Sequence, residues 1–375
     1  MSDKLVTLND LGYVNRGRSK HRPRNAPELY GGPYPFVQTA DIKHADLYLT
    51  EYEQTYSELG LAQSRLWPIG TLCITIAANI ADTAILGCEA CFPDSVIGFI
   101  PNEDKCDVRY VKYLFDTELQ ESFQQLSQGV AQDNLSKDKL LSVKFRIPDL
   151  PIQRRIADIL SAYDDLIENN RRRIAILEET ARLAYRKWFG GCEVRTVTLG
   201  EIADVVMGQS PESKTCNSQG EGLPFHQGVT GFGFRYPSNE MWCTAGTRFA
   251  EEGDILFSVR APVGRINVAN ERIVIGRGLS AMKAKNKCQS WLLYTLKQYF
   301  SKEDMIGVGC IFASTTKKEL LSVELPFPSE EEILVFERFA SPIDSQIKVL
   351  SKQSAALAAA RDMLLPRLMK GGVGL

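Results

Sequence analysis

The sequence has little excess charge of either sign and few histidines. Its 375 residues include 44 Lys and Arg against 46 Asp and Glu, which leaves a formal net charge of −2. A protein that binds nucleic acid through its overall charge is normally cationic, so contacts of that kind must come from local basic patches. For His21, His44 and His226, the only histidines, a core or surface position is the simplest interpretation.

Sequence motifs of the common catalytic classes are missing. There is no Walker loop, no HExxH, no GxSxG and no Asn/Asp-Pro-Pro-aromatic segment of the kind that holds a target adenine in amino-methyltransferases. The glycines of GFGFRYP (231–237) follow no βαβ pattern and do not indicate a dinucleotide site. Cys88 and Cys91 have CxxC spacing but no second pair follows, so core packing is favoured over zinc there.

The chain also lacks a long hydrophobic run. The most apolar stretch, residues 72–88, contains Asn79 and Asp82 and alternates as strands do, so we expect no membrane span. The first residues lead directly into a strand-like VTL and do not resemble a signal peptide. Nine cysteines, an odd number, fit reduced thiols better than a disulfide framework. Together these features predict a folded cytoplasmic protein.

One long helical pattern is present twice. Apolar residues recur at three- and four-residue steps from Pro151 to Trp188, over about five heptads, which predicts a coiled-coil helix about 55 Å long. The same register returns at one constant offset in the second half of the chain, where Leu140-Leu141-Ser142-Val143 recurs as Leu320-Leu321-Ser322-Val323. The apolar seam is expected at Ile156, Leu160, Tyr163, Ile167, Ile174, Leu177, Ala184, Phe336, Ile343, Ile347, Leu350, Leu357 and Leu364, with Asn170 as a polar register-fixing position.

The repeat extends upstream of both helices. Val6-Thr7-Leu8 recurs as Val197-Thr198-Leu199, and Pro35-Phe36-Val37-Gln38 as Pro224-Phe225-His226-Gln227. Short β-branched runs broken by Gly, Asn and Asp indicate a mixed, mostly β domain in each half. The predicted fold is therefore α+β, with domains at 1–147 and 192–327 separated by long helices within 148–191 and 328–375.

The helix ends carry recognisable signals. Asp149 is a candidate N-cap for the first helix, and the segment from Ser329 to Glu332 forms a capping box for the second. Pro342 and Pro366 are expected to kink or interrupt the second helix, because proline removes an intrahelical hydrogen bond. Arg171-Arg172-Arg173 follows Glu168 closely, so a solvated helix face is favoured there over a DNA patch.

Candidate DNA contacts lie in both predicted domains. In the first, residues 15–24 hold five basic residues and no acid, which favours phosphate contact over a merely solvated loop; these are Arg16, Arg18, Lys20, Arg22 and Arg24. Gln38 and Asn79 are amides suited to adenine, although bonding to backbone at a strand end is an equal alternative. In the second, the candidates are Gln227, Arg235, Arg260, Arg265, Arg277, Lys317 and Lys318. Arginine suits guanine and phosphate, but Arg260 or Arg277 could instead pair with a buried acid such as Asp254.

The order and duplication of these segments resemble the specificity subunit of type I restriction–modification systems. The resemblance rests on residues 147–189, on the ending RDMLLPRLMKGG, and on SVRAPVGRINVA followed by IGRGLSAM. It implies a non-catalytic subunit in which two target recognition domains each read one half of a split site in double-stranded DNA. It also implies an antiparallel helix pair, two methyltransferase subunits that use S-adenosylmethionine, and two restriction subunits that use ATP and Mg²⁺.

Two other functions remain open on the sequence alone. One is a coiled-coil scaffold that binds only proteins, and the other is an autonomous metal-dependent nuclease with a scattered acidic site. The missing motifs favour the specificity subunit, because such a subunit leaves the chemistry to its partners.

Overall fold

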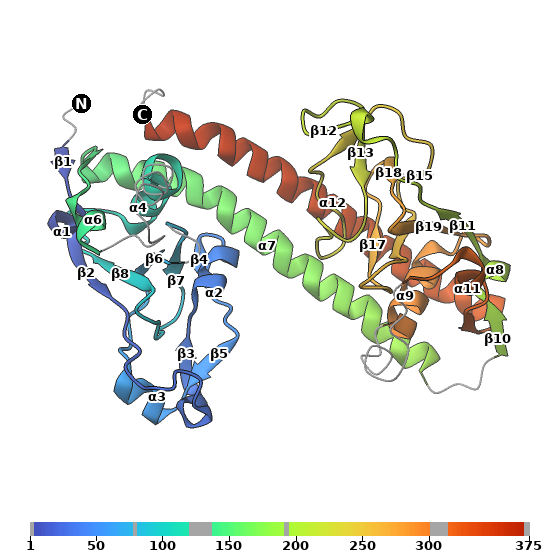
Figure 1. The fold of residues 1–375 in the computed structure, drawn as a ribbon, viewed down its shortest axis with the longest axis horizontal. Coiled ribbons are helices and arrows are strands. Elements are labelled where there is room, and N and C mark those ends of the chain that lie inside the picture. Colours follow the sequence, from blue (N-terminus) through green and yellow to red (C-terminus); the bar gives the residue numbers. More distant parts are fainter. Residues whose placement is uncertain (1–3, 78–80, 120–136, 191–194, 301–313, 371–375) are drawn as a thin grey trace. The chain divides into compact units, whose positions relative to one another are not determined.

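The computed structural model describes residues 4–77, 81–119, 137–190, 195–300 and 314–370 (Figure 1). The chain divides into two compact units, each of which takes a part of both long helices. Unit 1 comprises Met1–Asn170 and Gln353–Leu375, and unit 2 comprises Arg171–Lys352.

The main sheet of unit 1 has the strand order β2-β8-β6-β7-β4 among its described residues. The strands are β2 (Gly12–Arg16), β8 (Val96–Pro101), β6 (Leu72–Thr75), β7 (Thr83–Leu86) and β4 (Tyr48–Leu49). All neighbours are antiparallel except β4 and β7. Every residue of β6 and β7 is buried, which explains their unbroken apolar sequences.

Shorter elements surround this sheet. Two strand pairs are formed by β1 (Lys4–Val6) with β9 (Phe145–Ile147) and by β3 (Tyr30–Phe36) with β5 (Gln54–Tyr56). The helical segments are α1 (Leu8–Leu11), η1 (Pro27–Leu29), α2 (Thr39–His44), α3 (Glu58–Gln63), α4 (Val108–Leu114), η2 (Phe115–Leu119) and α6 (Lys137–Ser142). The buried side of α4 lies in the same core as Ile156 and Leu160 of the first long helix.

Unit 2 contains two main sheets among its described residues. One has the order β11-β19-β16-β17, from β11 (Ala203–Met207), β19 (Leu279–Ala284), β16 (Ile255–Ser258) and β17 (Ile266–Val268). The other has the order β12-β14-β13-β18-β15, from β12 (Cys216–Asn217), β14 (Trp242–Cys243), β13 (Leu223–His226), β18 (Ile273–Ile275) and β15 (Phe249–Ala250). The remaining elements are β10 (Arg195–Thr198) paired with β20 (Glu324–Phe327), α8 (Leu199–Ile202), η3 (Ser213–Thr215), α9 (Gln289–Phe300) and α11 (Lys317–Leu321).

The backbone hydrogen bonds confirm the internal repeat. Strands β2, β8, β6 and β7 have the same order and antiparallel pairing as β11, β19, β16 and β17. The bridge between Trp67 and Ala90 returns between Ala250 and Ile273, with the same displacement along the chain at both ends. Gly70 and Gly253, related by that displacement, both have positive φ, of 81° and 92°. The two units therefore share one register as well as one topology.

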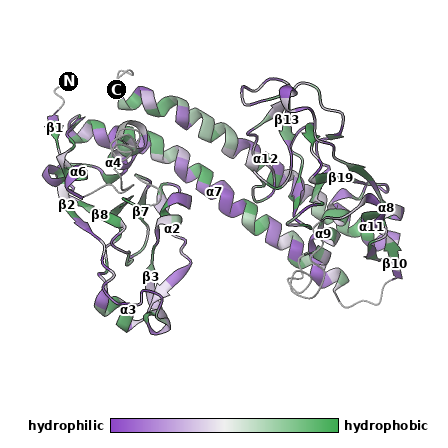
Figure 2. Cartoon of the chain, in the orientation of Figure 1, coloured by the Kyte–Doolittle hydropathy of each residue, from purple (hydrophilic) through white to green (hydrophobic). Residues whose placement is uncertain are grey.

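The long helices are α7 (Leu150–Phe189) and α12 (Glu330–Met369), each 40 residues long. In unit 1, Ile156 and Leu160 near the start of α7 share a core with Leu368 near the end of α12. In unit 2, Tyr185 near the end of α7 shares a core with Phe336 near the start of α12. The helices therefore run antiparallel, and Figure 2 shows apolar and polar positions alternating along both.

The positions expected to form the apolar seam are buried or half-buried. Ile156, Leu160, Phe336, Ile347 and Leu350 are buried, as is the polar Asn170. The other predicted seam positions are half-buried, namely Tyr163, Ile167, Ile174, Leu177, Ala184, Ile343, Leu357 and Leu364. Ala181, Tyr185 and Leu368, outside that set, are buried as well.

The helix ends follow the sequence, but the two prolines do not interrupt α12. Ser329 and Glu332 bond reciprocally, with the Ser329 backbone N–H donating to the Glu332 carboxylate at 2.9 Å. Asp149 directly precedes α7, and its carboxylate pairs with Lys4 at 3.0 Å. The expectation of an interruption at Pro342 or Pro366 is wrong, because α12 continues through both. Both prolines lie at exposed positions, where the lost backbone bond does not disturb the apolar seam.

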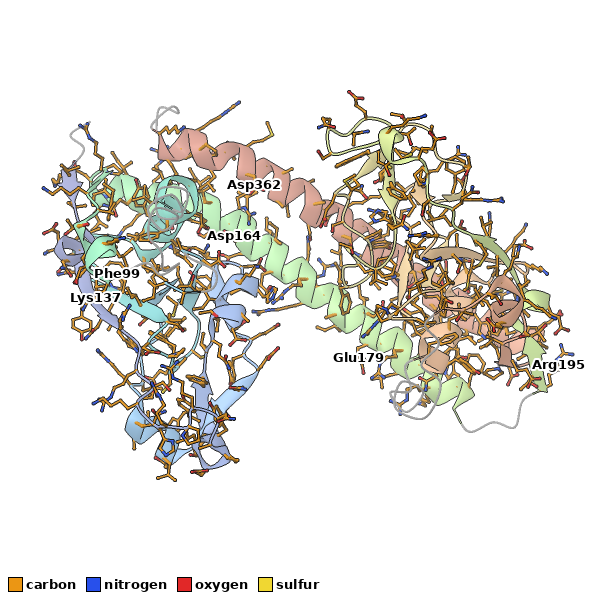
Figure 3. The ribbon with its side chains drawn as sticks, in the orientation of Figure 1. Phe99, Lys137, Asp164, Glu179, Arg195 and Asp362 are labelled. Atoms are coloured by element: carbon orange, nitrogen blue, oxygen red, sulfur yellow. The ribbon has the colours of Figure 1, made fainter. Side chains whose placement is uncertain are left out.

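An aspartate joins each sheet domain to the helix pair, buried in unit 1 and half-buried in unit 2. In unit 1, Asp164 of α7 accepts hydrogen bonds from the Tyr113 hydroxyl and from Arg361 of α12, the latter at 2.5 Å (Figure 3). In unit 2, Asp344 of α12 accepts from the Tyr294 hydroxyl at 3.1 Å and from Arg235 at 2.5 Å. Burial, followed by the neighbouring carboxylate, raises the pKa of both tyrosines, so each phenol stays protonated and donates.

The cluster in unit 2 contains further charges. Arg235 also donates to Glu178 of α7 at 2.7 Å, and Glu178 in turn pairs with Lys297. Only 4% of the Arg235 side chain is exposed. An unpaired charge at such a position is costly, so each member depends on the others.

Replacing Arg235 with Ala should destabilise the protein by about 3 kcal/mol or more, because Glu178 and Asp344 then lose the cation they share. The measurement is the urea unfolding curve of the purified chain. The control is Arg272→Ala, which removes an ion pair with Glu251. The Arg272 side chain is 54% exposed, so this variant should lose about 0.5 kcal/mol of stability or less. Equal, small effects of the two variants would contradict a structural role for Arg235.

Candidate nucleic-acid interface

The basic segment of unit 1 is held against the main sheet by its backbone. The Gly17 N–H donates to the Val96 carbonyl at 2.8 Å, and the Arg18 N–H donates to the Phe92 carbonyl at 3.0 Å. A Cβ at Gly17 would lie 2.2 Å from the Pro93 carbonyl oxygen, so the close approach requires glycine. The basic side chains therefore project from a fixed path.

The five basic residues of this segment fall into two groups. Arg22 donates to the carbonyls of Ser19 and His21 at 2.9 and 2.7 Å, and Arg24 donates to both carboxylate oxygens of Asp94 at 3.0 Å. Arg16, Arg18 and Lys20 are exposed and form no ion pair with any described residue. These three are the side chains best placed to contact phosphates, whereas Arg22 and Arg24 have protein partners.

The amides predicted to read adenine have different surroundings. Gln38 occupies the N-cap position of α2, and its Nε2 donates to Gln54 Oε1 at 2.7 Å. Gln38 therefore bonds to a side chain of the neighbouring strand β5, which is neither a base contact nor the backbone contact expected as the alternative. Gln227 is exposed and its Oε1 accepts from the Ser210 hydroxyl at 3.0 Å. Asn79 lies outside the described residues.

Three of the predicted arginines of unit 2 are exposed, namely Arg260, Arg265 and Arg277. In the described part of the chain, none of them forms an ion pair with Asp254, whose carboxylate instead accepts from the Glu251 backbone at 2.9 Å. Burial raises the pKa of that carboxyl group. Lys317 and Lys318 are also exposed and line a shallow hollow with Thr198 and Gly200.

The assignment of Arg235 to DNA is corrected by the structure. Its guanidinium is buried between Glu178 and Asp344, with Tyr294 beneath it, so an external ligand does not reach it. The neighbouring Phe234 is 68% exposed. Two successive residues of the segment 231–237 therefore point in different directions, Arg235 into the protein and Phe234 into solvent.

Sequence reasoning passed over a second polar cluster on unit 1. Arg65 lies over the rings of Trp67 and Tyr13, with its Cζ 4.2 and 4.9 Å from their centroids. Its Nη1 donates to the Tyr13 hydroxyl at 2.8 Å, as does the amide of Asn15. The internal repeat of the sequence could have revealed this cluster. The offset that relates Trp67 to Ala250 also aligns Arg65 with Arg248.

No resident metal or membrane element emerges from the described residues. They hold no group of three or more His, Cys, Asp and Glu side chains arranged to bind a metal ion. Within the same ranges, no helix is both long enough and apolar enough to cross a membrane. Cys91 is buried beside Phe36, and burial raises the pKa of its thiol.

The duplicated sheet domains, the paired long helices and the exposed basic side chains define a two-part DNA-binding subunit. Two segments of the chain, residues 4–179 and 192–357, match the family described as the type I restriction modification DNA specificity domain. The chain therefore belongs to this family. Members are the DNA-recognition components of type I systems and not the catalytic ones.

Named relatives agree with this membership, and a solved structure shares the fold. The chain is 30% identical over 296 residues to a protein of Methanocaldococcus jannaschii named as the type I restriction enzyme MjaX specificity subunit, covering 73% of this chain and 70% of the relative. It is 22% identical to the MjaIX specificity subunit of the same organism, covering 97% and 92%. The crystal structure of a type I restriction–modification S subunit from M. genitalium has the same fold, with a TM-score of 0.65, 16% identity and coverage of 98% and 96%.

Replacing Arg16 and Arg18 together with Ala should weaken DNA binding about equally on all sequences. Two lost phosphate contacts should flatten the plot of log K against log salt by about two. The measurement is the binding constant of the assembled complex at several salt concentrations. The control is the double variant Arg24→Ala, Asp94→Ala, which removes a paired cation and anion and should leave the slope unchanged. An unaltered slope in the first variant would mean that this segment does not contact phosphate.

Proposed function

We propose that each unit reads one half of a bipartite DNA target and that the helix pair fixes the length of the unspecified spacer between the halves. In this proposal the chain directs adenine methylation and ATP-dependent cleavage by partner subunits. It is itself the specificity subunit of the type I complex, consistent with its family.

The observation that carries the proposal is the repeat. Both units place the same strands in the same register, yet they present different side chains on the exposed segments. The basic loop after β2 is matched by a polar Gly/Ser loop after β11, where Gly17 and Arg18 correspond to Gly208 and Gln209. One scaffold with two different surfaces suits the recognition of two different short sequences.

The partners in this proposal are two methyltransferase subunits and two restriction subunits. S-adenosylmethionine, ATP and Mg²⁺ act in those partners rather than in this chain. The lack of catalytic motifs in the sequence supports that division of labour.

The exposed apolar side chains of the long helices support binding of such partners. On α7 these include Ile176 and Leu183, which are 66% and 49% exposed, and on α12 they include Leu334 and Val335, which are 48% and 50% exposed. Large apolar side chains that are open to water on these helices supply apolar area for contact with a protein partner. A methyltransferase subunit is the occupant that we propose for this surface.

The two rival functions make different predictions. A scaffold that binds only proteins would leave every DNA sequence unprotected even in the assembled complex. An autonomous nuclease would cleave DNA in the presence of Mg²⁺ without any partner. Methylation of a split motif by the complex, together with inactivity of the isolated chain, is the combination expected for the specificity subunit.

The spacer proposal is tested by lengthening both helices at the boundary between the units. Four residues inserted after Asn170 in α7 and four after Lys352 in α12 add about 6 Å to each helix. Four residues are close to one turn, so the apolar seam stays nearly in phase. At about 3.4 Å per base pair, the spacer should grow by one or two base pairs while the bases read on either side stay the same. Methylome sequencing of cells that carry the complex measures both quantities.

The control for this variant is an insertion of two residues at each of the same points. Two residues rotate the seam by about half a turn, so the helix pair should lose stability and the complex its activity. An unchanged spacer with full activity in the four-residue variant would show that the helices do not set the distance.

Replacing Val335 with Arg should lower the affinity for the methyltransferase subunit about tenfold or more, because a charge would then be buried in an apolar contact. The measurement is the dissociation constant of the purified chain for that subunit. Arg338→Ala, at an exposed polar position of the same helix, is the control and should have little effect. An unchanged affinity together with an unchanged unfolding midpoint would place the partner elsewhere.

A further inference from the structure

The arginine cluster on unit 1 is built on a platform that the sheet provides. Trp67 lies over Gly98 of β8, where a Cβ would come within 2.6 Å of the indole. Gly98 is the cross-strand neighbour of Asn15 on β2. A glycine in the strand therefore makes room for a tryptophan to lie on the sheet, and Arg65 rests on that tryptophan.

The guanidinium of Arg65 is fixed in orientation but not neutralised. It is stacked on Trp67 and bonded through Nη1 to the Tyr13 hydroxyl, and it forms no ion pair with any described residue. Arg24, in contrast, has its carboxylate partner in Asp94. A planar cation held flat on aromatic rings keeps its remaining N–H donors available for an acceptor from outside.

The surroundings of Arg65 have a matching character. Tyr13 is 46% exposed, and the Asn15 amide that donates to its hydroxyl is half-buried. The Asn15 Oδ1 accepts from Lys137 of α6 at 3.2 Å, and Figure 3 labels that lysine. The cluster thus joins two cations, an amide and two aromatic rings, with no carboxylate bonded to any of them among the described residues. An acceptor-rich, negatively charged ligand suits this composition.

Unit 2 carries an arginine at the equivalent point of the fold. Arg65 and Arg248 each lie five residues before the positive-φ glycine, Gly70 or Gly253, that leads into the central strand. Two residues after each arginine, Trp67 pairs with Ala90 and Ala250 pairs with Ile273, so the strand contacts that follow the two arginines correspond. Arg248 is exposed and, within the described ranges, has no acidic partner. Among the described residues, each unit therefore has an arginine without a carboxylate partner at the same position of its fold. This correspondence indicates that both arginines serve the same function.

We infer that Arg65 and Arg248 are the equivalent base-reading arginines of the two units, each directed at the major-groove edge of a guanine in its own half of the target. Guanine presents O6 and N7 as two acceptors, which match the fork of an arginine side chain. This inference rests on the proposed function, because it assumes that each unit reads a half-site. It deepens that function by naming one residue for each half.

The test compares Arg65→Ala, Arg65→Lys, Arg248→Ala and the wild type in the assembled complex. Methylome sequencing gives the motif of each, and binding to target duplexes changed one base pair at a time gives the discrimination. Arg65→Ala should lose about ten- to a hundredfold discrimination at one base pair of one half-site and leave the other half-site intact. Arg248→Ala should do the same in the other half-site only. Arg65→Lys keeps the charge without the fork and should fail in the same way as Arg65→Ala.

Three outcomes overturn the inference. If Arg65→Lys keeps full discrimination, the fork of the arginine is not what reads the base pair. If Arg65→Ala weakens binding equally on all sequences and flattens the salt slope by about one, the contact is to phosphate. If both Ala variants change the same half-site, the two arginines are not equivalent. Arg24→Ala and Arg272→Ala, which remove ion-paired arginines from units 1 and 2, are the controls and should leave the motif unchanged.

The wild-type motif separates this inference from the proposed function. A split motif in the wild type that persists unchanged in every arginine variant would refute the inference alone. A wild type that methylates no split motif would refute both. An unfolding curve for each purified variant excludes misfolding as the cause, and Arg65→Gln replaces Arg65→Ala if the alanine variant does not fold.

Discussion

The structure of each unit depends on one aspartate, buried or half-buried, that links the sheet domain to the long helices. Asp164 and Asp344 lie on the long helices, and each is bonded to a tyrosine of the adjoining sheet domain and to an arginine. A buried carboxylate is tolerable only while its hydrogen bonds and its cation remain in place. The sheet domain therefore cannot leave its helices without exposing or stranding that charge, and the position of the reading surface follows from this constraint.

The two units meet the same constraint with different residues. In unit 1 the cation is Arg361, which comes from α12 itself. In unit 2 it is Arg235, which comes from a loop of the sheet domain and also neutralises Glu178. The shared feature is thus a charge balance at a fixed position and not a particular residue pair. This explains how two halves with little sequence in common can keep one register throughout.

Those parts of the fold that depend on local pattern could be predicted from the sequence. The seam, the capping box at Ser329 and the duplication follow from spacing along the chain, which a helix converts directly into a face. Arg235 could not be placed in this way, because its partners Glu178 and Asp344 lie 57 and 109 residues away. The same holds for Gln38, whose amide meets Gln54 only after β3 and β5 have paired. Whether a polar side chain remains available to a ligand depends on partners that are distant in the sequence. The spacing of residues along the chain does not identify those partners.

The face of the sheet beneath Trp67 is buried but is subject to a looser constraint than the helix contacts. Trp67 over Gly98 in unit 1 corresponds to Ala250 and Ala281 in unit 2, both at the offset that aligns Arg65 with Arg248, and both alanines lie in one apolar cluster. The pair of Trp67 and Gly98 in unit 1 is thus replaced by two alanines in unit 2, without any change in strand register. Arg65 is consequently fixed on an aromatic ring, whereas Arg248 has no such platform from the equivalent residue. A fixed guanidinium loses less entropy on meeting a base, so one shared scaffold can present one sharply and one loosely oriented arginine.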